Sequence, residues 1–94
     1  IFLGFIPHKK GRNKLFKEIL NSKRTVVFYE SPHRILKTLD SLIALKPLKK
    51  LIVCRELTKK FEIIYRGSAE EILEQIKKDF PSGKPKGEFV LVVG

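Results

Sequence analysis

The sequence predicts an α/β domain with a mixed, mostly parallel sheet of about five strands flanked by helices. Short apolar runs typical of strands alternate with helical periodicity, in the order β-α-β-α-β-β-α-β. At 94 residues the chain can bury one hydrophobic core but not two, so residues 1–94 are expected to form a single domain. Its 43% hydrophobic and 32% charged residues indicate a soluble globular protein and exclude a disordered or membrane-spanning chain.

The first half of the chain predicts two strands and two helices. Residues 2–5 and 25–29 are short apolar runs, and the second is rich in β-branched and aromatic residues. A helix is expected between them over 13–22, with Asn13 as its N-cap. A second helix is expected to begin at Ser31, a good N-cap followed by a proline that suits the first helical turn.

The second half predicts three strands and one helix. The strands are expected over 51–54, 62–66 and 88–93, separated by charged or glycine-containing segments. The helix before the last strand is expected to begin at Ser68, which has the spacing to form a capping box with Glu71. A loop containing glycine, proline and lysine follows this helix.

The charge of the chain favours a polyanionic partner. Lysine and arginine total 20 against 10 acids, for a net charge of +10. Residues 1–24 hold seven of the bases and one acid, so +6 of the total lies there. Nucleic acid and an anionic membrane surface are both compatible with this excess, and a merely soluble basic surface remains an alternative. The loop over 81–87, with Lys84 and Lys86, is a weaker basic signal.

Several classes of protein are excluded or disfavoured by what the sequence lacks. No apolar run is long enough to cross a bilayer and no signal peptide is present, so a cytoplasmic location is expected. No P-loop, GxGxxG or zinc-ligand spacing occurs, so no metal is implied and Cys54 is expected in the core. The chain has no methionine and opens on an apolar stretch, which predicts a segment of a longer protein.

Two segments at predicted strand ends carry the chemically richest side chains. They span 29–34 and 55–59, and the carboxyl ends of strands in open α/β sheets are where ligands gather. Structural interpretations remain open for both. Ser31 can serve only as a helix cap, and Glu30 can be held by Arg34 or Arg55 as an ion pair that specifies the fold.

Four segments follow one another along the chain: 4–7 with Lys10 and Arg12, then 29–34, 55–59 and 86–93. Together they resemble the ribosomal RNA small subunit methyltransferase I family of the tetrapyrrole methylase superfamily, over essentially all 94 residues. The resemblance implies the C-terminal domain of a two-domain, homodimeric enzyme that uses S-adenosylmethionine. The implied reaction is methylation of the ribose 2′-oxygen of a cytidine in small-subunit rRNA. The N-terminal domain, which supplies most of the donor site, is absent, so this chain alone is expected to be inactive.

The resemblance implies the residues of the donor site, and the basic charge suggests those that contact RNA. The donor is expected to lie against Arg55, Glu56, Leu57 and Thr58. No general base can be assigned, although Glu30 is a candidate. Phosphate contact is expected from basic residues near these segments, since cations supply much of the sequence-independent affinity for RNA: Lys9, Lys10, Arg12, Arg34, Lys59 and Lys60.

Two other functions remain possible from the sequence. A non-catalytic basic module that binds RNA or a ribosomal surface needs no donor site, and the charge permits it. A methylase domain acting on a tetrapyrrole or another small molecule keeps the superfamily but leaves the lysine excess without a purpose.

Overall fold

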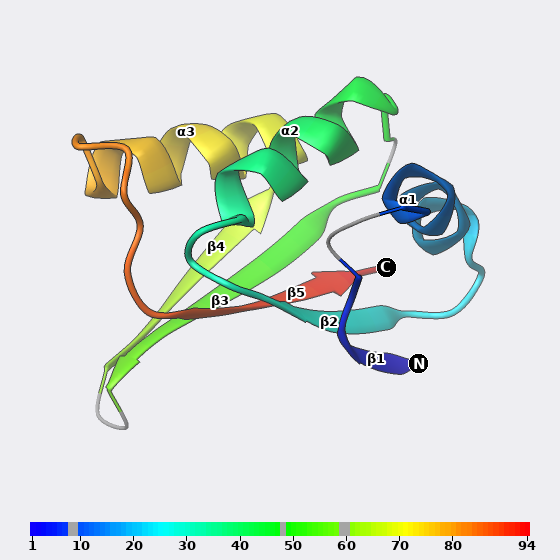
Figure 1. The fold of residues 1–94 in the computed structure, drawn as a ribbon, viewed down its shortest axis with the longest axis horizontal. Coiled ribbons are helices and arrows are strands. Elements are labelled where there is room, and N and C mark those ends of the chain that lie inside the picture. Colours follow the sequence, from blue (N-terminus) through cyan, green and yellow to red (C-terminus); the bar gives the residue numbers. More distant parts are fainter. Residues whose placement is uncertain (8–9, 48, 59–60) are drawn as a thin grey trace.

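The structure, a computed structural model, describes residues 1–7, 10–47, 49–58 and 61–94. The element order predicted from the sequence is confirmed (Figure 1). The elements are β1 (Phe2–Phe5), α1 (Arg12–Asn21), β2 (Val26–Glu30), α2 (Ile35–Ala44), β3 (Leu51–Thr58), β4 (Phe61–Gly67), α3 (Ala69–Asp79) and β5 (Glu88–Val93).

The five strands form one mixed sheet in the order β1-β2-β5-β3-β4. Only β1 and β2 pair in parallel, while the other three pairs are antiparallel. The prediction of a mostly parallel sheet is therefore wrong. Each helix does connect two strands that run in the same direction, as a β-α-β unit requires. However, β5 inserts between β2 and β3, and β3 forms a hairpin with β4, so most neighbours are antiparallel.

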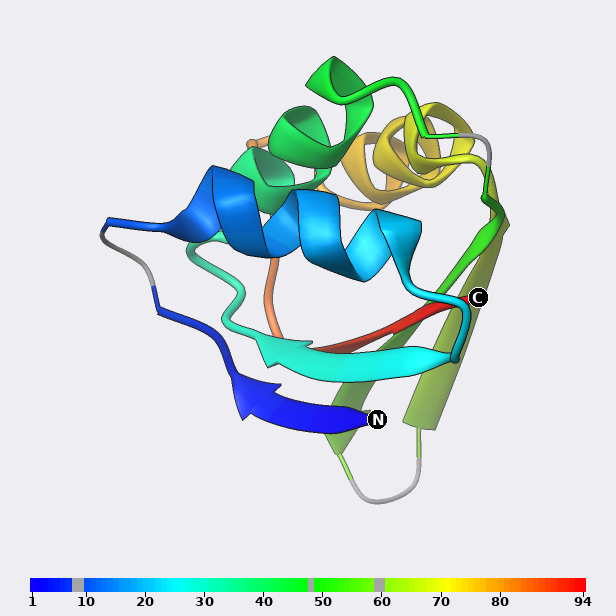
Figure 2. The ribbon, with the colours of Figure 1, turned by 90° about the vertical axis from the view of Figure 1, so that its right-hand side faces the viewer.

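All three helices lie on one face of the sheet (Figures 1 and 2). Residues alternate along β2, β3 and β5, so that every second side chain points toward the helices and is buried. The core lies between the two layers and includes Phe16, Phe28, Leu39, Val53, Ile72 and Leu91, none of which is exposed. None of the helices in the described part of the chain combines the length and apolarity needed to cross a membrane.

The opposite face of the sheet carries apolar side chains that no helix covers. Phe2, Tyr29 and Ile64 are exposed there, with 60%, 38% and 46% of their surface accessible. Cys54, whose position was expected in the core, is half-buried on this face beside Ile64. Burial raises the pKa of its thiol. The sheet thus has one face covered by helices and one open face.

The helix starts differ in how well the sequence predicted them. Ser68 caps α3 through the expected capping box: its hydroxyl accepts from the Glu71 N–H and the Glu71 carboxylate accepts from the Ser68 N–H. Asn13 is not a cap, because α1 begins one residue earlier, after Gly11. Gly11 adopts a φ of +89°, a conformation that glycine tolerates better than other residues.

The start of α2, in contrast, is later than predicted. The helix begins at Ile35, with Arg34 in the N-cap position, so Ser31 is not its N-cap. The carbonyl of Ser31 instead accepts from the N–H groups of Arg34 and Ile35, at 3.1 Å each, which makes a turn that leads into the helix. The Ser31 N–H donates to the Glu30 carboxylate. The turn is therefore organised by Glu30 rather than by the serine hydroxyl.

Strand β3 continues past Cys54, where the sequence predicted its end, to Thr58. In this extension it pairs with β5 as far as Glu56 and with β4 as far as Thr58. The alternation persists because Arg55 faces the helices and is buried, while Glu56 faces away and is exposed. The sequence prediction ended this strand too early because its last residues are charged or polar, whereas pairing with β4 and β5 keeps them in the sheet.

Candidate functional site

The two strand ends that the sequence singled out meet at the same edge of the sheet. Strands β2 and β3 run in the same direction on either side of β5, so their carboxyl ends lie together. Phe89 of β5 is the register partner of both Glu30 and Arg55. On the open face, Glu56 is opposite Glu88. Segments 25 residues apart in the sequence are thus separated by a single strand.

A cavity of about 200 Å³ lies at this edge. Two aromatic residues and two acidic residues form part of its lining: Phe5, Tyr29, Glu56 and Glu88. Ser31 also lines it, and the buried Ser31 hydroxyl has no hydrogen-bond partner among the described residues. Buried polar groups are nearly always paired, so an unpaired buried hydroxyl on a residue that lines a cavity is unusual.

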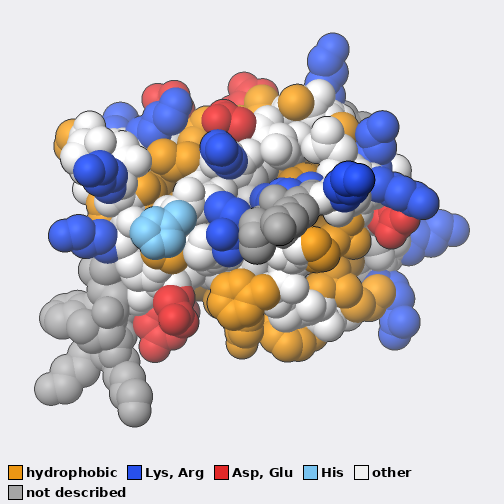
Figure 3. All heavy atoms as spheres, viewed as in Figure 1, with side chains coloured by type: hydrophobic (Ala, Val, Ile, Leu, Met, Phe, Trp, Pro, Cys, Tyr) orange, Lys and Arg blue, Asp and Glu red, His pale blue; other side chains and the backbone are white. Residues whose placement is uncertain are grey.

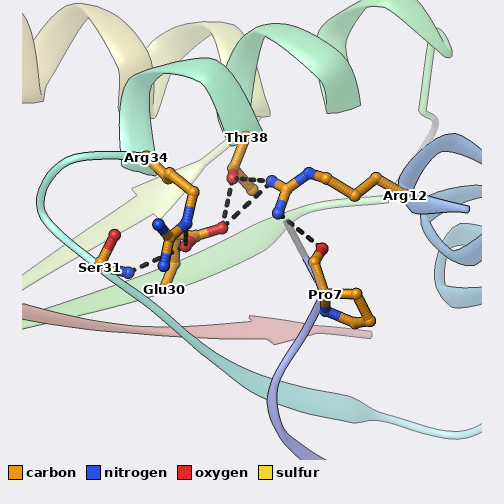
Figure 4. Close-up of polar contacts among 6 residues, drawn as sticks. All are labelled: Pro7, Arg12, Glu30, Ser31, Arg34 and Thr38. Carbon is orange, nitrogen blue, oxygen red and sulfur yellow. Dashed lines mark hydrogen bonds and ion pairs between the residues drawn. The ribbon is translucent and has the colours of Figure 1, made fainter. Parts of the chain in front are cut away.

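Glu30, the last residue of β2, is only 2% exposed and forms ion pairs with Arg12 and Arg34 (Figure 4). Its Oε1 accepts from the Ser31 N–H at 2.9 Å and from Arg34 Nε at 3.2 Å. Its Oε2 accepts from Thr38 Oγ1 at 2.5 Å and from Arg12 Nη2 at 3.3 Å. Both oxygens are therefore engaged twice, as a buried carboxylate requires.

Arg12 extends this cluster from β2 and α2 to α1 and the segment after β1. Its Nη2 also donates to Thr38 Oγ1 at 2.7 Å, and its Nη1 donates to the Pro7 carbonyl at 2.9 Å (Figure 4). The guanidinium lies 5.1 Å from the Phe16 ring, close enough for a cation–π contact. The arrangement favours the structural interpretation of Glu30, with Arg34 as foreseen but with Arg12 in place of Arg55.

Arg55 is the second buried charge at this edge, with 5% exposure. Its guanidinium lies 4.4 Å from the Phe80 ring and 5.9 Å from the Tyr65 ring, and 3.7 Å separates its Nη2 from Asp79 Oδ2. Its Nε has no hydrogen-bond partner among the described residues. Burial, and then the hydrogen bond to Asp79, raises the pKa of Tyr65.

The four residues expected to bind the donor therefore differ in position. Arg55 points under α3 and does not line the cavity, whereas Glu56 does. Leu57 and Thr58 occupy the last two positions of β3. The cavity also includes Glu88, which the sequence analysis did not single out as a ligand-binding residue.

The residues expected to contact RNA are not a single cluster. Lys9, Lys59 and Lys60 lie outside the described residues. Arg12 and Arg34 are engaged by Glu30, with 17% and 35% of their side chains exposed. Lys10 is exposed.

Sequence reasoning missed Thr38 and the surroundings of Arg55. Thr38 lies on the apolar face of α2 with Ile35 and Leu39, and it is fully buried. A hydroxyl on an otherwise apolar helix face is a detectable signal that a buried polar partner exists. Nothing local marks Phe80 and Asp79 as partners of Arg55. No group of three possible metal-ligating side chains occurs among the residues that the structure describes.

The chain is similar to proteins named ribosomal RNA small subunit methyltransferase I. That of Halalkalibacterium halodurans is 40% identical over 98% of this chain and 31% of its own length. Those of Escherichia coli O157:H7 and Thermotoga maritima are 41% and 34% identical, over 96% and 99% of this chain and 32% and 40% of their own lengths. The chain thus spans about a third of the length of these relatives, because the three alignments cover 31% to 40% of each relative.

The fold is similar to that of a solved cobalamin biosynthetic enzyme, cobalt precorrin-4 methyltransferase CbiF. The two share 16% sequence identity with a TM-score of 0.63, over 98% of this chain and 39% of that chain. Residues 2–73 match the family described as tetrapyrrole (corrin/porphyrin) methylases. This match covers most of the chain, including both segments that meet at the cavity. The chain belongs to the tetrapyrrole methylase family.

Proposed function

We propose that this chain is the C-terminal part of an S-adenosylmethionine-dependent enzyme that methylates the ribose 2′-oxygen of a cytidine in small-subunit rRNA. The observation that carries the proposal is the cavity at the ends of β2 and β3, which is lined by residues from segments 29–34 and 55–59. The family match and the relatives named ribosomal RNA small subunit methyltransferase I support the same conclusion. Such an enzyme works in the cytoplasm on small ribosomal subunits, and we propose that it does so as a homodimer.

The lining of the cavity suits the adenosyl part of the donor. The carboxylates of Glu56 and Glu88 can accept hydrogen bonds from ribose hydroxyls, as acidic residues do in other nucleotide sites. The rings of Phe5 and Tyr29 offer an apolar surface for a base. The volume of about 200 Å³ is below the roughly 300 Å³ at which small-molecule sites begin, so the cavity would hold only part of the donor.

The residues expected to bind the donor divide into two roles in this proposal. Glu56, with the backbone of Leu57 and Thr58 at the end of β3, contacts the donor. Arg55 acts from below the strand, because its guanidinium packs on Phe80 and positions the strand end. The Ser31 hydroxyl supplies a further contact.

The chemistry requires positioning more than acid or base groups. The donor supplies a sulfonium methyl group that is already electrophilic, so the protein must mainly hold the 2′-oxygen in line with it. Glu30 is the candidate base from the sequence, but its two oxygens are taken by Arg12, Arg34, Thr38 and the Ser31 N–H. We propose that it holds the turn beside the cavity, and we assign no general base.

Donor binding by titration calorimetry tests the cavity directly. We expect Glu56→Gln to weaken S-adenosylmethionine binding about tenfold, because a hydrogen bond to a charged group contributes about 1.5 kcal/mol. Ser31→Ala should weaken binding by less, with a change in stability within about 0.5 kcal/mol, since its hydroxyl has no protein partner. Glu74→Gln is the control, because Glu74 is exposed on α3.

Methyl transfer to small ribosomal subunits tests the reaction. It should be measured with the product of the complete open reading frame and with this chain alone, using donor labelled in the methyl group. Labelled 2′-O-methylcytidine from the former supports the proposal. RNA binding with neither donor binding nor transfer would support the non-catalytic basic module instead, and transfer only to a tetrapyrrole would support the small-molecule methylase.

A further inference from the structure

A groove adjoins the donor cavity at Pro32, which lines both. Its volume is about 490 Å³, and we name it the 81–87 groove after the loop that forms one wall. This loop runs from α3 to β5 and passes the start of α2 (Figure 1). The two walls are formed by Pro32, His33 and Leu36 on one side and by Lys84, Pro85 and Lys86 on the other.

The groove is basic, and the described part of the chain offers no ion-pair partner to its two lysines. Lys84, Lys86 and His33 are exposed, and none is within ion-pair distance of a carboxylate among the described residues. Blue lysine and arginine side chains are spread over the face drawn in Figure 3, with red acidic side chains between them. The two lysine ammonium groups therefore remain available to an anionic ligand.

The backbone of the loop presets the position of the two lysines. Two prolines restrict it, and the Gly83 N–H donates to the Phe80 carbonyl at 2.9 Å, which closes a turn after α3. Gly83 has a φ of +78°, which favours glycine there. Lys84 and Lys86 are two residues apart, so their Cα atoms are separated by at most roughly 7 Å. They can contact separate phosphates of one strand, and the restricted loop backbone lowers the part of the ordering cost that comes from the main chain.

We propose that the 81–87 groove binds the sugar–phosphate backbone of the substrate RNA beside the donor cavity. The inference rests on the proposed function, since it assigns a binding surface to the same reaction. The charge of the donor cavity is complementary to the methyl donor, and the charge of the 81–87 groove is complementary to RNA. Glu56 and Glu88 in the cavity attract a cationic sulfonium and repel phosphate, whereas Lys84 and Lys86 attract phosphate. Their adjacency at Pro32 would bring ribose and donor together.

Removing the two lysines should weaken RNA binding and leave donor binding unchanged. We expect Lys84→Ala/Lys86→Ala to lower the affinity for a labelled single-stranded RNA about tenfold at moderate salt, measured by fluorescence anisotropy. The slope of log affinity against log salt should fall in magnitude by roughly 1.4 to 1.8, because two phosphate contacts are lost. The KM for small ribosomal subunits should rise by a similar factor, with an unchanged Kd for S-adenosylmethionine.

The matched control removes the same charge at the opposite end of the sheet. Lys23 and Arg24 are exposed between α1 and β2, at the amino end of β2. Lys23→Ala/Arg24→Ala should change the salt slope by less than one unit. If both double variants lost RNA affinity equally, the proposed groove would be wrong and the RNA would be bound only by the overall positive charge.

Different experimental results would contradict the groove proposal and the proposed function. Methyl transfer to small subunits with an unchanged KM in Lys84→Ala/Lys86→Ala would overturn the groove and leave the function intact. A selective loss of RNA affinity in that variant, with no methyl transfer by the unmodified full-length protein, would overturn the function and support the groove. A weakened S-adenosylmethionine Kd would assign the lysines to the donor and overturn the inference. All assays use the product of the complete open reading frame.

Discussion

Glu30 and Arg55 are buried charges of opposite sign on either side of Phe89, and the protein stabilises them by different means. Glu30 is surrounded by donors, since Arg12, Arg34, Thr38 and a backbone N–H saturate both of its oxygens. Arg55 lies against aromatic rings, with an ion pair to a half-exposed carboxylate and an unpaired Nε.

This difference follows from the chemistry of the two groups. A carboxylate concentrates its charge on two oxygens and must be matched by donors when buried. A guanidinium spreads its charge over a plane that can stack on aromatic rings, so it tolerates incomplete hydrogen bonding better. We therefore expect the Glu30 cluster to be sensitive to substitution and the Arg55 contacts to be tolerant.

The largest effect is expected at Glu30. Glu30→Gln keeps the shape of the side chain but removes its charge, which leaves the partly buried Arg12 without its counter-charge. We expect a loss of about 3 kcal/mol in the free energy of unfolding, since breaking a buried pair from one side is strongly destabilising. Urea unfolding followed by circular dichroism measures it, with Glu74→Gln as the exposed control. A loss no greater than that of the control would show that the cluster does not hold the fold.

A smaller, pH-dependent effect is expected at Tyr65, which donates to Asp79 beside Arg55. Tyr65→Phe should cost about 1 kcal/mol at neutral pH. Burial raises the pKa of folded Tyr65 above that of an unfolded tyrosine. The tyrosine's contribution is therefore fully present below pH about 10 and is lost as the pH rises further. The stability difference between Tyr65→Phe and the unmodified protein should shrink over that range in urea titrations, and a constant difference would contradict this account.

The smallest effect is expected at Arg55 itself. Arg55→Met replaces a buried cation with an apolar side chain that can pack on Tyr65 and Phe80, and Asp79 is 42% exposed and can be solvated. Lost cation–π contacts offset the removal of an unsatisfied buried Nε, so the change in unfolding free energy should stay within about 1 kcal/mol. Urea unfolding measures this change as well. A loss of unfolding free energy as large as that of Glu30→Gln would mean that both buried charges contribute equally to stability.

Part of the candidate site could be predicted from the sequence. Segments 29–34 and 55–59 were identified by their chemistry and by the rule that ligands gather at strand ends, and the structure brings 29–34 and the described residues of 55–59 to one edge. Arg34 was foreseen as a partner of Glu30 because it is four residues away. Arg12 and Thr38 were not, since their approach depends on how α1 and α2 pack against β2. Arg12 was instead assigned to RNA because its charge was visible and its partner was not.

The sequence by itself determined the order and type of every helix and strand, together with the capping box at Ser68. These features depend on apolar periodicity and on hydrogen bonds between residues that are close in the chain. Only the tertiary structure decided that β5 lies between β2 and β3, which makes the sheet mostly antiparallel. The apolar pattern of a strand specifies which face is buried and says nothing about its neighbours. That choice is made by packing between segments far apart in the sequence, and the same packing brought Glu30 and Arg55 to one edge of the sheet.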